Sequence, residues 1–117
     1  CSGEGMFRKE AVAAAQHSDA LVAHCAELGA EILENAAVLL APGGVLVYST
    51  CTLLPAENRE GTEAFLAAHP EFEPLDFFFP SCDPACPDIV SERGAVTLMP
   101  DLHGTDGFFI ARMRRKD

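Results

Sequence analysis

One transition along the sequence constrains the fold more than any other feature. Apolar residues recur every three or four positions over residues 19–40, which predicts an amphipathic helix that begins after Ser18, a favourable N-cap residue. A Pro-Gly-Gly turn at 42–44 ends this helix, and a short apolar, β-branched run follows at 45–48. A helix joined to such a strand by a tight turn predicts an α/β protein, with a parallel strand at 44–50 that is buried on both faces.

The rest of the chain predicts one further helix and several short strands. Pro55 suits the first turn of the second helix, and the His69-Pro70 pair ends it. The predicted elements are a helix at 56–68, strands at 72–76, 95–99 and 107–113, and an irregular proline-containing loop at 77–94. The last two strands flank a turn and are expected to pair as a hairpin.

Composition and charge exclude several classes of protein. The 117 residues suffice for one domain or a part of one. Eighteen acidic against eight basic residues give a net charge of -10, which argues against this segment as a nucleic-acid clamp. No apolar run approaches the ~20 residues that cross a bilayer, so we expect no membrane insertion and a cytoplasmic location.

Cysteine usage indicates reduced thiols and no metal site. The five cysteines form an odd number without the regular spacing of a secreted disulfide scaffold. Cys82 and Cys86 have no second Cys or His pair nearby, so they are not expected to complete a four-ligand zinc site. The only basic cluster, at 112–116, is expected to be a solvated strand end rather than a binding site.

Cys51 is the strongest candidate for a chemical role. It directly follows the predicted strand at 44–50, and the carboxyl ends of such strands are where α/β proteins gather ligands and catalytic groups. A thiol at this place can act as a nucleophile when a helix N-terminus favours the thiolate, and a helix that begins near Pro55 could do so. The alternative is that Cys51 is a small buried apolar residue of the core.

Three segments resemble successive motifs of one enzyme family. They are CSGEGMFRK at 1–9, LLAPGGVLVYSTCTLLPAENRE at 39–60 and HGTDGFFIARMRR at 103–115. In order and spacing they resemble the Sun-type RNA 5-methylcytosine methyltransferases, and the FRK of the first segment is most similar to the RsmF-like bacterial branch. The resemblance implies the C-terminal part of a Rossmann-like S-adenosylmethionine-dependent methyltransferase fold, with a mixed sheet whose last strand, at 107–113, is antiparallel.

The resemblance also implies an activity and roles for individual residues. The implied reaction transfers a methyl group from S-adenosylmethionine to carbon 5 of a cytosine in RNA, with rRNA as the expected partner. Cys51 is implied to add to carbon 6 of the base, and Cys1 to assist release of the methylated product. Thr50, Ser49 and Arg8 are the expected substrate-binding residues.

The same resemblance predicts that the catalytic domain is incomplete. The glycine-rich cofactor loop and the acidic ribose-binding residue of the family precede the region that aligns, so no cofactor-binding residue is assigned. The chain also opens at Cys1, inside a motif and without an initiator Met. Residues 1–117 are therefore expected to be a partial methyltransferase domain that is inactive alone and self-associates through an unpaired strand edge.

Two other classes of function remain open at this point. One is a non-catalytic interaction domain, derived from the same fold, that binds a partner through its acidic surface. The other is a cysteine hydrolase in which Cys51 acts with His24 or His103, although no local signature of such an enzyme surrounds the cysteine.

Overall fold

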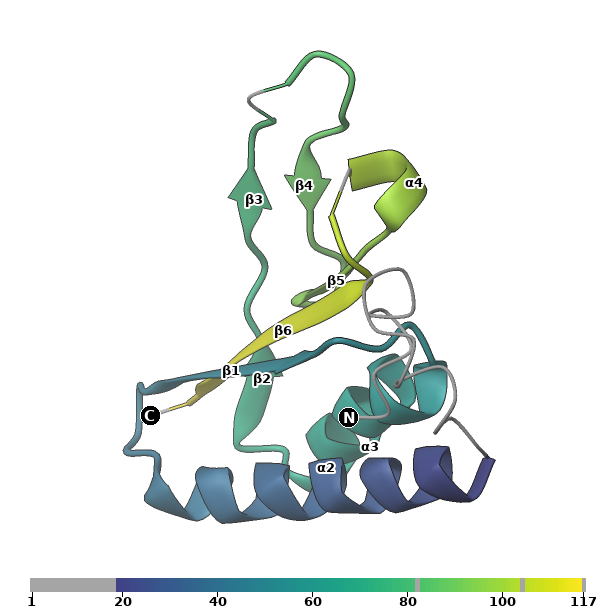
Figure 1. Cartoon of the computed structure of the whole chain (residues 1–117). Coiled ribbons are helices and arrows are strands. Elements are labelled where there is room, and N and C mark those ends of the chain that lie inside the picture. The colour runs from purple at the N-terminus through teal and green to yellow at the C-terminus, as the bar shows by residue number, and fades with distance from the viewer. Residues whose placement is uncertain (1–18, 82, 104, 117) are drawn as a thin grey trace.

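The computed structural model describes residues 19–81, 83–103 and 105–116 (Figure 1). Its centre is a four-stranded antiparallel sheet, and two helices pack against one face of this sheet. A separate two-stranded hairpin projects away from the helices. The elements, in chain order, are α2 (Asp19–Leu39), β1 (Val45–Thr50), the single-turn 3₁₀ helix η2 (Pro55–Glu57), α3 (Arg59–Ala68), β2 (Phe72–Pro74), β3 (Phe78–Phe79), β4 (Ile89–Val90), β5 (Ala95–Leu98), α4 (Pro100–His103) and β6 (Phe108–Arg115).

Strand β6 lies at the centre of the sheet. On one side it pairs antiparallel with the whole of β1, from Val45 opposite Arg114 to Thr50 opposite Phe109. On its other side, β5 pairs with the first half of β6 and β2 with its last residues. The predicted hairpin and the antiparallel last strand are thus confirmed. All pairs among the described strands are antiparallel, so these strands do not include a parallel partner for β1.

The hydrophobic core lies between the sheet and the two helices. Successive side chains of a strand point to opposite faces, and alternate residues of β6 therefore point inward. The buried apolar residues are Leu33 and Ala37 of α2, Phe65 of α3, Phe72 of β2, Ala95 of β5, and Phe109, Ala111 and Met113 of β6. The predicted helix at 19–40 is confirmed as α2, which contributes Leu33 and Ala37 to this core.

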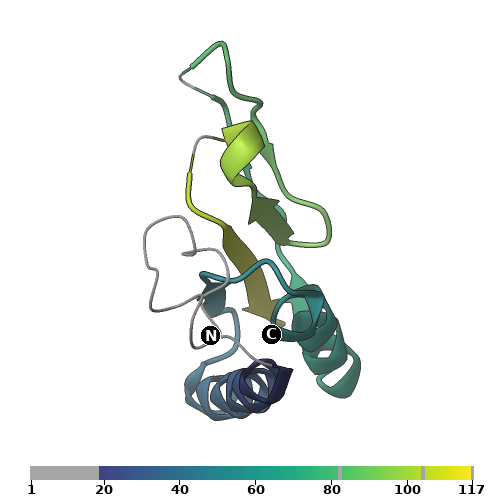
Figure 2. The same ribbon diagram turned by 45° about the vertical axis from the view of Figure 1, so that its right-hand side comes forward.

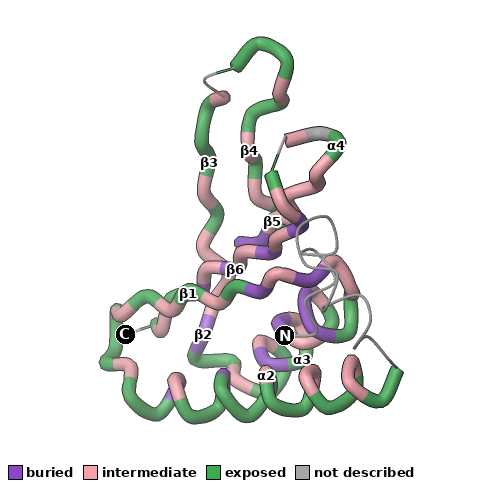
Figure 3. Tube along the Cα trace, in the orientation of Figure 1, coloured by how far each residue is buried: buried purple, intermediate pink, exposed green. Residues whose placement is uncertain are grey.

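The second face of the sheet is open in the described chain. Val45 and Val47 of β1 are 46% and 59% exposed, whereas Leu46 and Tyr48, which alternate with them, pack against the core. Figure 3 shows exposed and half-buried positions along β1. The prediction that β1 is buried on both faces is therefore wrong for this chain. The physical reason is that α2 and α3 both cover the same face, whereas the other face meets only the base of the β3–β4 hairpin, where Phe77 and Phe79 lie near Val47.

The second helix differs from its prediction at Asn58. The predicted helix at 56–68 is divided into η2 and α3, because the backbone of Asn58 (φ -113, ψ -106) is not helical. Pro55 does occupy the first position of η2, as predicted. The α-helical part begins only at Arg59, so Cys51 is not followed directly by an α-helix N-terminus.

The segment at 77–94 is a projecting hairpin rather than an irregular loop. Phe78 pairs with Val90, and Phe79 pairs with Ile89, in a short two-stranded sheet. Figure 2 shows that this hairpin extends away from α2 and α3. The prediction of a loop was wrong because the prolines lie between and beside the paired residues and leave the pairing itself intact.

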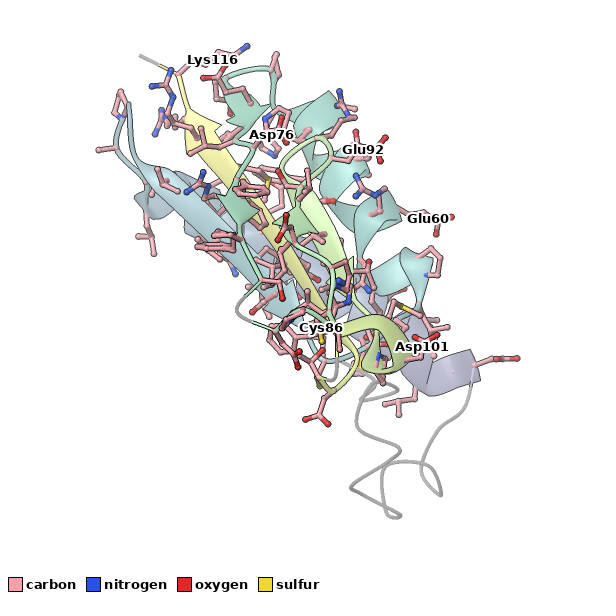
Figure 4. All side chains as sticks on the ribbon, turned by 90° about the horizontal axis from the view of Figure 1, so that it is seen from above. Glu60, Asp76, Cys86, Glu92, Asp101 and Lys116 are labelled. Carbon is pink, nitrogen blue, oxygen red and sulfur yellow. The ribbon has the colours of Figure 1, made fainter. Side chains whose placement is uncertain are left out.

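The basic cluster at 112–116 holds neighbouring segments of the chain. The described contacts run from Arg112 to the carbonyls of Leu75 and Asp76, from Arg114 to the Glu73 carboxylate, from Arg115 to the carbonyl of Leu40, and from Lys116 to the carbonyl of Pro70. In Figure 4, Lys116 lies toward one end of the molecule, and Cys86 and Asp101 lie toward the opposite end. These contacts favour a structural role for the cluster.

No helix of the described part is long and apolar enough to span a membrane.

A histidine at the end of α3 ties three elements together. The His69 ring stacks on Phe65, with 4.4 Å between ring centroids. Its Nε2 lies 2.7 Å from a carboxylate oxygen of Glu34 on α2, and its Nδ1 lies 3.1 Å from Glu71. The hydrogen bond to Glu34, followed by the contribution of Glu71, raises the pKa of His69 above 6.5, against an opposing effect of burial.

This pKa shift predicts a pH-dependent contribution to stability. Because the folded-state pKa is raised, the contribution of His69 is fully present below the unfolded value of 6.5 and is lost as the pH rises through the folded value. We expect the melting temperature of the wild type to exceed that of His69→Gln most below pH 6.5, with the difference shrinking as the pH increases. Thermal melts followed by circular dichroism measure this difference.

The same exchange at the exposed residue His24, which lies on α2 outside this cluster, controls for the loss of a histidine. A difference between wild type and His69→Gln that stays constant from acidic to alkaline pH would contradict the assignment.

Candidate active site

Cys51 lies one residue beyond the carboxyl end of β1, as the sequence predicts. Its side chain is half-buried and lines a cavity of about 360 Å³ between β1 and α2. The cavity is lined by Cys25, Leu28, Gly29 and Ile32 of α2, by Tyr48, Ser49, Thr50 and Cys51, and by Glu57 and Phe108. A cysteine at the wall of a mainly apolar cavity with a few polar groups fits the usual character of a small-molecule or base-binding site.

One face of α2 forms a wall of this cavity. Cys25, Leu28, Gly29 and Ile32 are three or four residues apart and therefore share a face of the helix. The residues of α2 that enter the core are Leu33 and Ala37, whereas Leu28 and Ile32 at the cavity are 43% and 60% exposed.

A buried hydrogen-bond network surrounds the backbone of Cys51. The hydroxyl of Thr50 donates to Oδ1 of Asn58 at 2.5 Å, and Nδ2 of Asn58 donates to the carbonyl of Thr52 at 2.8 Å. The hydroxyl oxygen of Thr50 accepts the amide of Thr52 at 3.4 Å. Thr50, Thr52 and Asn58 are 7%, 0% and 3% exposed, so this network is shielded from water.

Tyr48 stands between the cavity and the core. Its hydroxyl donates to the carbonyl of Glu57 at 2.9 Å, and its ring meets Phe109 edge-to-face with 6.5 Å between centroids. Burial, and next the negative charge of Glu57, raise the pKa of the Tyr48 hydroxyl above 10.0. Tyr48 therefore remains a neutral hydrogen-bond donor at physiological pH and holds the end of η2 against β1.

The structure brings three of the predicted site residues together. Ser49 is exposed and, like Cys51, lines the cavity. Thr50 is buried, with its hydroxyl engaged by Asn58, and the roles of Ser49 and Thr50 in substrate binding stay predictions. Cys1 and Arg8 lie outside the described residues.

The histidines of the hydrolase alternative are not at the cavity. His24 is an exposed residue of α2, and Nδ1 of His103 accepts the backbone amide of Met99 at 2.9 Å. Neither residue lines the cavity that contains Cys51. Among the described residues, no histidine at the cavity could act as a base for Cys51. The structure therefore does not support the hypothesis of a cysteine hydrolase.

Seven residues that line the cavity were not predicted as site residues from the sequence: Cys25, Leu28, Gly29, Ile32, Tyr48, Glu57 and Phe108. The only signal in the sequence was a cysteine and a glycine within an otherwise apolar helical stripe, and this signal is compatible with ordinary core packing. Which part of α2 faces the cavity is decided by how the helix crosses β1.

The described residues do not form a recognisable cofactor or metal site. A nucleotide-type cofactor is commonly held by a glycine-rich loop that leads from a strand into a helix. In this chain, Gly43 and Gly44 lie between a helix and a strand, and the connection from β1 to η2 contains no glycine. No group of three or more His, Cys, Asp or Glu side chains in the described part could hold a metal ion.

Solved structures similar to this chain define its class. A methyltransferase homologue from Pyrococcus horikoshii is 32% identical with a TM-score of 0.74, over 98% of this chain and 36% of that protein. NSun6 from Pyrococcus horikoshii, solved with SFG, is 29% identical with a TM-score of 0.62, over 79% of this chain and 22% of that protein. The chain therefore has the fold of a part of a methyltransferase.

The family follows from a match over nearly the whole chain. Residues 1–114 match the profile of 16S rRNA methyltransferase RsmB/F, and the chain belongs to this family. It is 37% and 39% identical to ribosomal RNA small subunit methyltransferase F of Serratia proteamaculans and of Cronobacter sakazakii, over 98% of this chain. The match covers 24% of each relative, so the chain spans about a quarter of their length.

The contact between α2 and Tyr48 yields a stability prediction. Replacing glycine by alanine inside a helix ordinarily stabilises a protein by about 0.5–1 kcal/mol. A Cβ at Gly29, however, would lie 2.6 Å from the hydroxyl oxygen of Tyr48. We therefore expect Gly29→Ala to lower the free energy of unfolding by about 1–3 kcal/mol, as measured by urea denaturation.

Two variants control this experiment. A Cβ at Gly61 of α3 meets nothing nearer than 3.6 Å, so Gly61→Ala should be neutral or stabilising. In a Tyr48→Phe background, which lacks the hydroxyl, the cost of Gly29→Ala should shrink, and a double-mutant cycle measures this coupling. Equal effects of Gly29→Ala in the two backgrounds would show that the contact with the hydroxyl is not the cause.

Proposed function

We propose that this chain is the part of an RNA 5-methylcytosine methyltransferase that carries the cysteine nucleophile, Cys51, and that the intact enzyme modifies rRNA in the cytoplasm. The observation that carries the proposal is the position of Cys51, at the wall of a cavity and at the carboxyl end of a strand, in a chain of the RsmB/F family. The names of the relatives, rRNA methyltransferases, support the choice of substrate.

The proposed reaction explains why a cysteine is needed. Carbon 5 of an aromatic cytosine does not react with a methyl donor until a nucleophile adds to the ring. The thiolate of Cys51 forms an S–C bond to carbon 6, and the electron pair of the 5,6 double bond moves to carbon 5. Carbon 5 takes the methyl group that S-adenosylmethionine supplies. A base of the intact enzyme then takes the proton from carbon 5, whose bonding electrons restore the 5,6 double bond as the S–C bond breaks and Cys51 leaves as the thiolate.

The remaining tasks belong to other parts of the intact enzyme. The described residues offer no cofactor loop, and the net charge of -10 repels RNA phosphates. Arg112 and Arg114 of β6, and Lys116 just beyond it, are engaged by carbonyls and by Glu73. We assign cofactor binding and the cationic RNA-binding surface to the part of the relatives' length that this chain does not span.

The role of Cys51 predicts a large effect on catalysis. In the intact enzyme, Cys51→Ala should reduce methyl transfer to RNA by at least about 10⁴-fold, because the covalent path is lost. Transfer of a labelled methyl group to RNA measures this. The matched control is Cys86→Ala in the projecting hairpin, which should keep near-normal turnover. Normal turnover of the Cys51→Ala enzyme would contradict the proposed role of Cys51 as the nucleophile.

Cys1 is assigned to product release, in the role that the family resemblance implies for it. An enzyme that forms the S–C bond through Cys51 but lacks Cys1 should retain the covalent adduct. We expect Cys1→Ala to accumulate a protein–RNA complex that survives denaturing electrophoresis, and the double variant with Cys51→Ala to show none. Absence of this slow-migrating species in the single variant would count against the role of Cys1.

The chain alone is proposed to self-associate and to bind S-adenosylmethionine negligibly. No described strand pairs with the second edge of β1, and open edges invite pairing between molecules. Val47 on the open sheet face and Leu39 at the end of α2 are 59% and 87% exposed. Such apolar exposure favours association despite the negative charge.

Light scattering and calorimetry on the purified 117-residue chain test both statements. We expect a mass above that of the monomer that falls when Val47→Lys is introduced on the open sheet face. Glu60→Lys, which changes an exposed side chain of α3, is the matched control for the change in charge. A clean monomer that binds the cofactor at micromolar concentration would contradict both statements.

A further inference from the structure

We propose that Asn58 is a positioning residue that fixes the Cys51 thiol at the wall of the cavity. Its side-chain amide is 3% exposed and contacts the residues on both sides of Cys51. Oδ1 accepts the hydroxyl of Thr50 at 2.5 Å, and Nδ2 donates to the carbonyl of Thr52 at 2.8 Å. One planar group thus holds the chain immediately before and immediately after the cysteine.

The place of Asn58 in the helix supports this role. Asn58 occupies the N-cap position of α3, where an asparagine side chain ordinarily accepts a backbone N–H of the first turn. Here the side chain makes no such capping bond, and its backbone carbonyl accepts the amide of Thr62 at 3.0 Å. The amide group is directed to the Cys51 segment at the expense of the helix it begins.

Further hydrogen bonds restrict the backbone conformation of the segment around Cys51. The hydroxyl oxygen of Thr50 accepts the amide of Thr52, and the hydroxyl of Thr52 accepts the amide of Leu54 at 3.4 Å. In a buried network whose members are mutually bonded, moving one member breaks several bonds at once. The backbone around Cys51 is therefore fixed, and its half-buried side chain faces the cavity.

Two substitutions separate the functions of the amide. Asn58→Asp keeps the shape and the acceptor for Thr50 but replaces the donor to the carbonyl of Thr52 by an oxygen. Asn58→Leu keeps a similar volume and removes both bonds. Asn35, exposed on α2, takes the same two substitutions as matched controls.

The first experiment measures thiol access in the 117-residue chain. Each variant is treated with iodoacetamide, and mass spectrometry follows alkylation of Cys51 against Cys86 in the projecting hairpin. Release of the segment should expose the thiol, so we expect alkylation of Cys51 to be about threefold faster or more in both Asn58 variants, from local opening alone. Cys86 and the Asn35 variants should stay close to wild type.

The second experiment measures turnover of the intact enzyme and rests on the proposed function. A displaced nucleophile loses its alignment with the base while RNA binding is retained, so kcat should fall by about 100-fold with little change in KM for RNA. Faster alkylation together with slower turnover is the signature of positioning, because a merely less reactive thiol would slow both.

Each other outcome has a definite meaning. Unchanged alkylation of Cys51 in folded Asn58 variants would overturn the inference, and so would a parallel rise at Cys86. Loss of folding in both variants would also overturn it, since Asn58 would then serve the fold as a whole. If Cys51→Ala leaves methyl transfer intact, the proposed function fails, and the alkylation experiment still decides whether Asn58 positions the thiol.

Discussion

The backbone pairing of β6 is the constraint on which the rest of the structure depends. Its eight residues pair with β1 along one edge and with β2 and β5 along the other. They also contribute Phe109, Ala111 and Met113 to the core. Buried amide and carbonyl groups need partners, so none of these three strands is complete without β6. β5 reaches β6 through a short connection, whereas β1 and β2 pair with it across long stretches of sequence, and such distant pairings slow folding.

Elements that depend on local pattern were predictable, and those that depend on tertiary context were not. The periodicity of α2 and its Pro-Gly-Gly stop place the helix within a residue of its observed end. The apolar run of β1 predicts a strand, but it cannot report that only one face meets a helix. The helical break at Asn58 could not be predicted from local pattern, because the side chain of Asn58 bonds to Thr50, which lies on β1 eight residues earlier.

The candidate site divides in the same way. Cys51 could be found from its place at a strand end and from the segment around it, and the structure puts it at a cavity. Cys25 and Gly29 could not be found, because the crossing of α2 over β1 decides which residues of the helical stripe face that cavity. The hydrogen bonds of Asn58 to Thr50 and Thr52 could not be predicted either, since an asparagine after a proline-initiated turn is expected to cap the helix.

The position of Tyr48 has a spectroscopic consequence. The chain contains one tyrosine and no tryptophan, so its tyrosine fluorescence comes from a single ring. That ring lines the cavity beside Cys51, meets Phe109 at its edge and is anchored through its hydroxyl to the carbonyl of Glu57. The unmodified chain therefore carries its own optical reporter at the wall of the candidate site, where the ring also touches the core through Phe109.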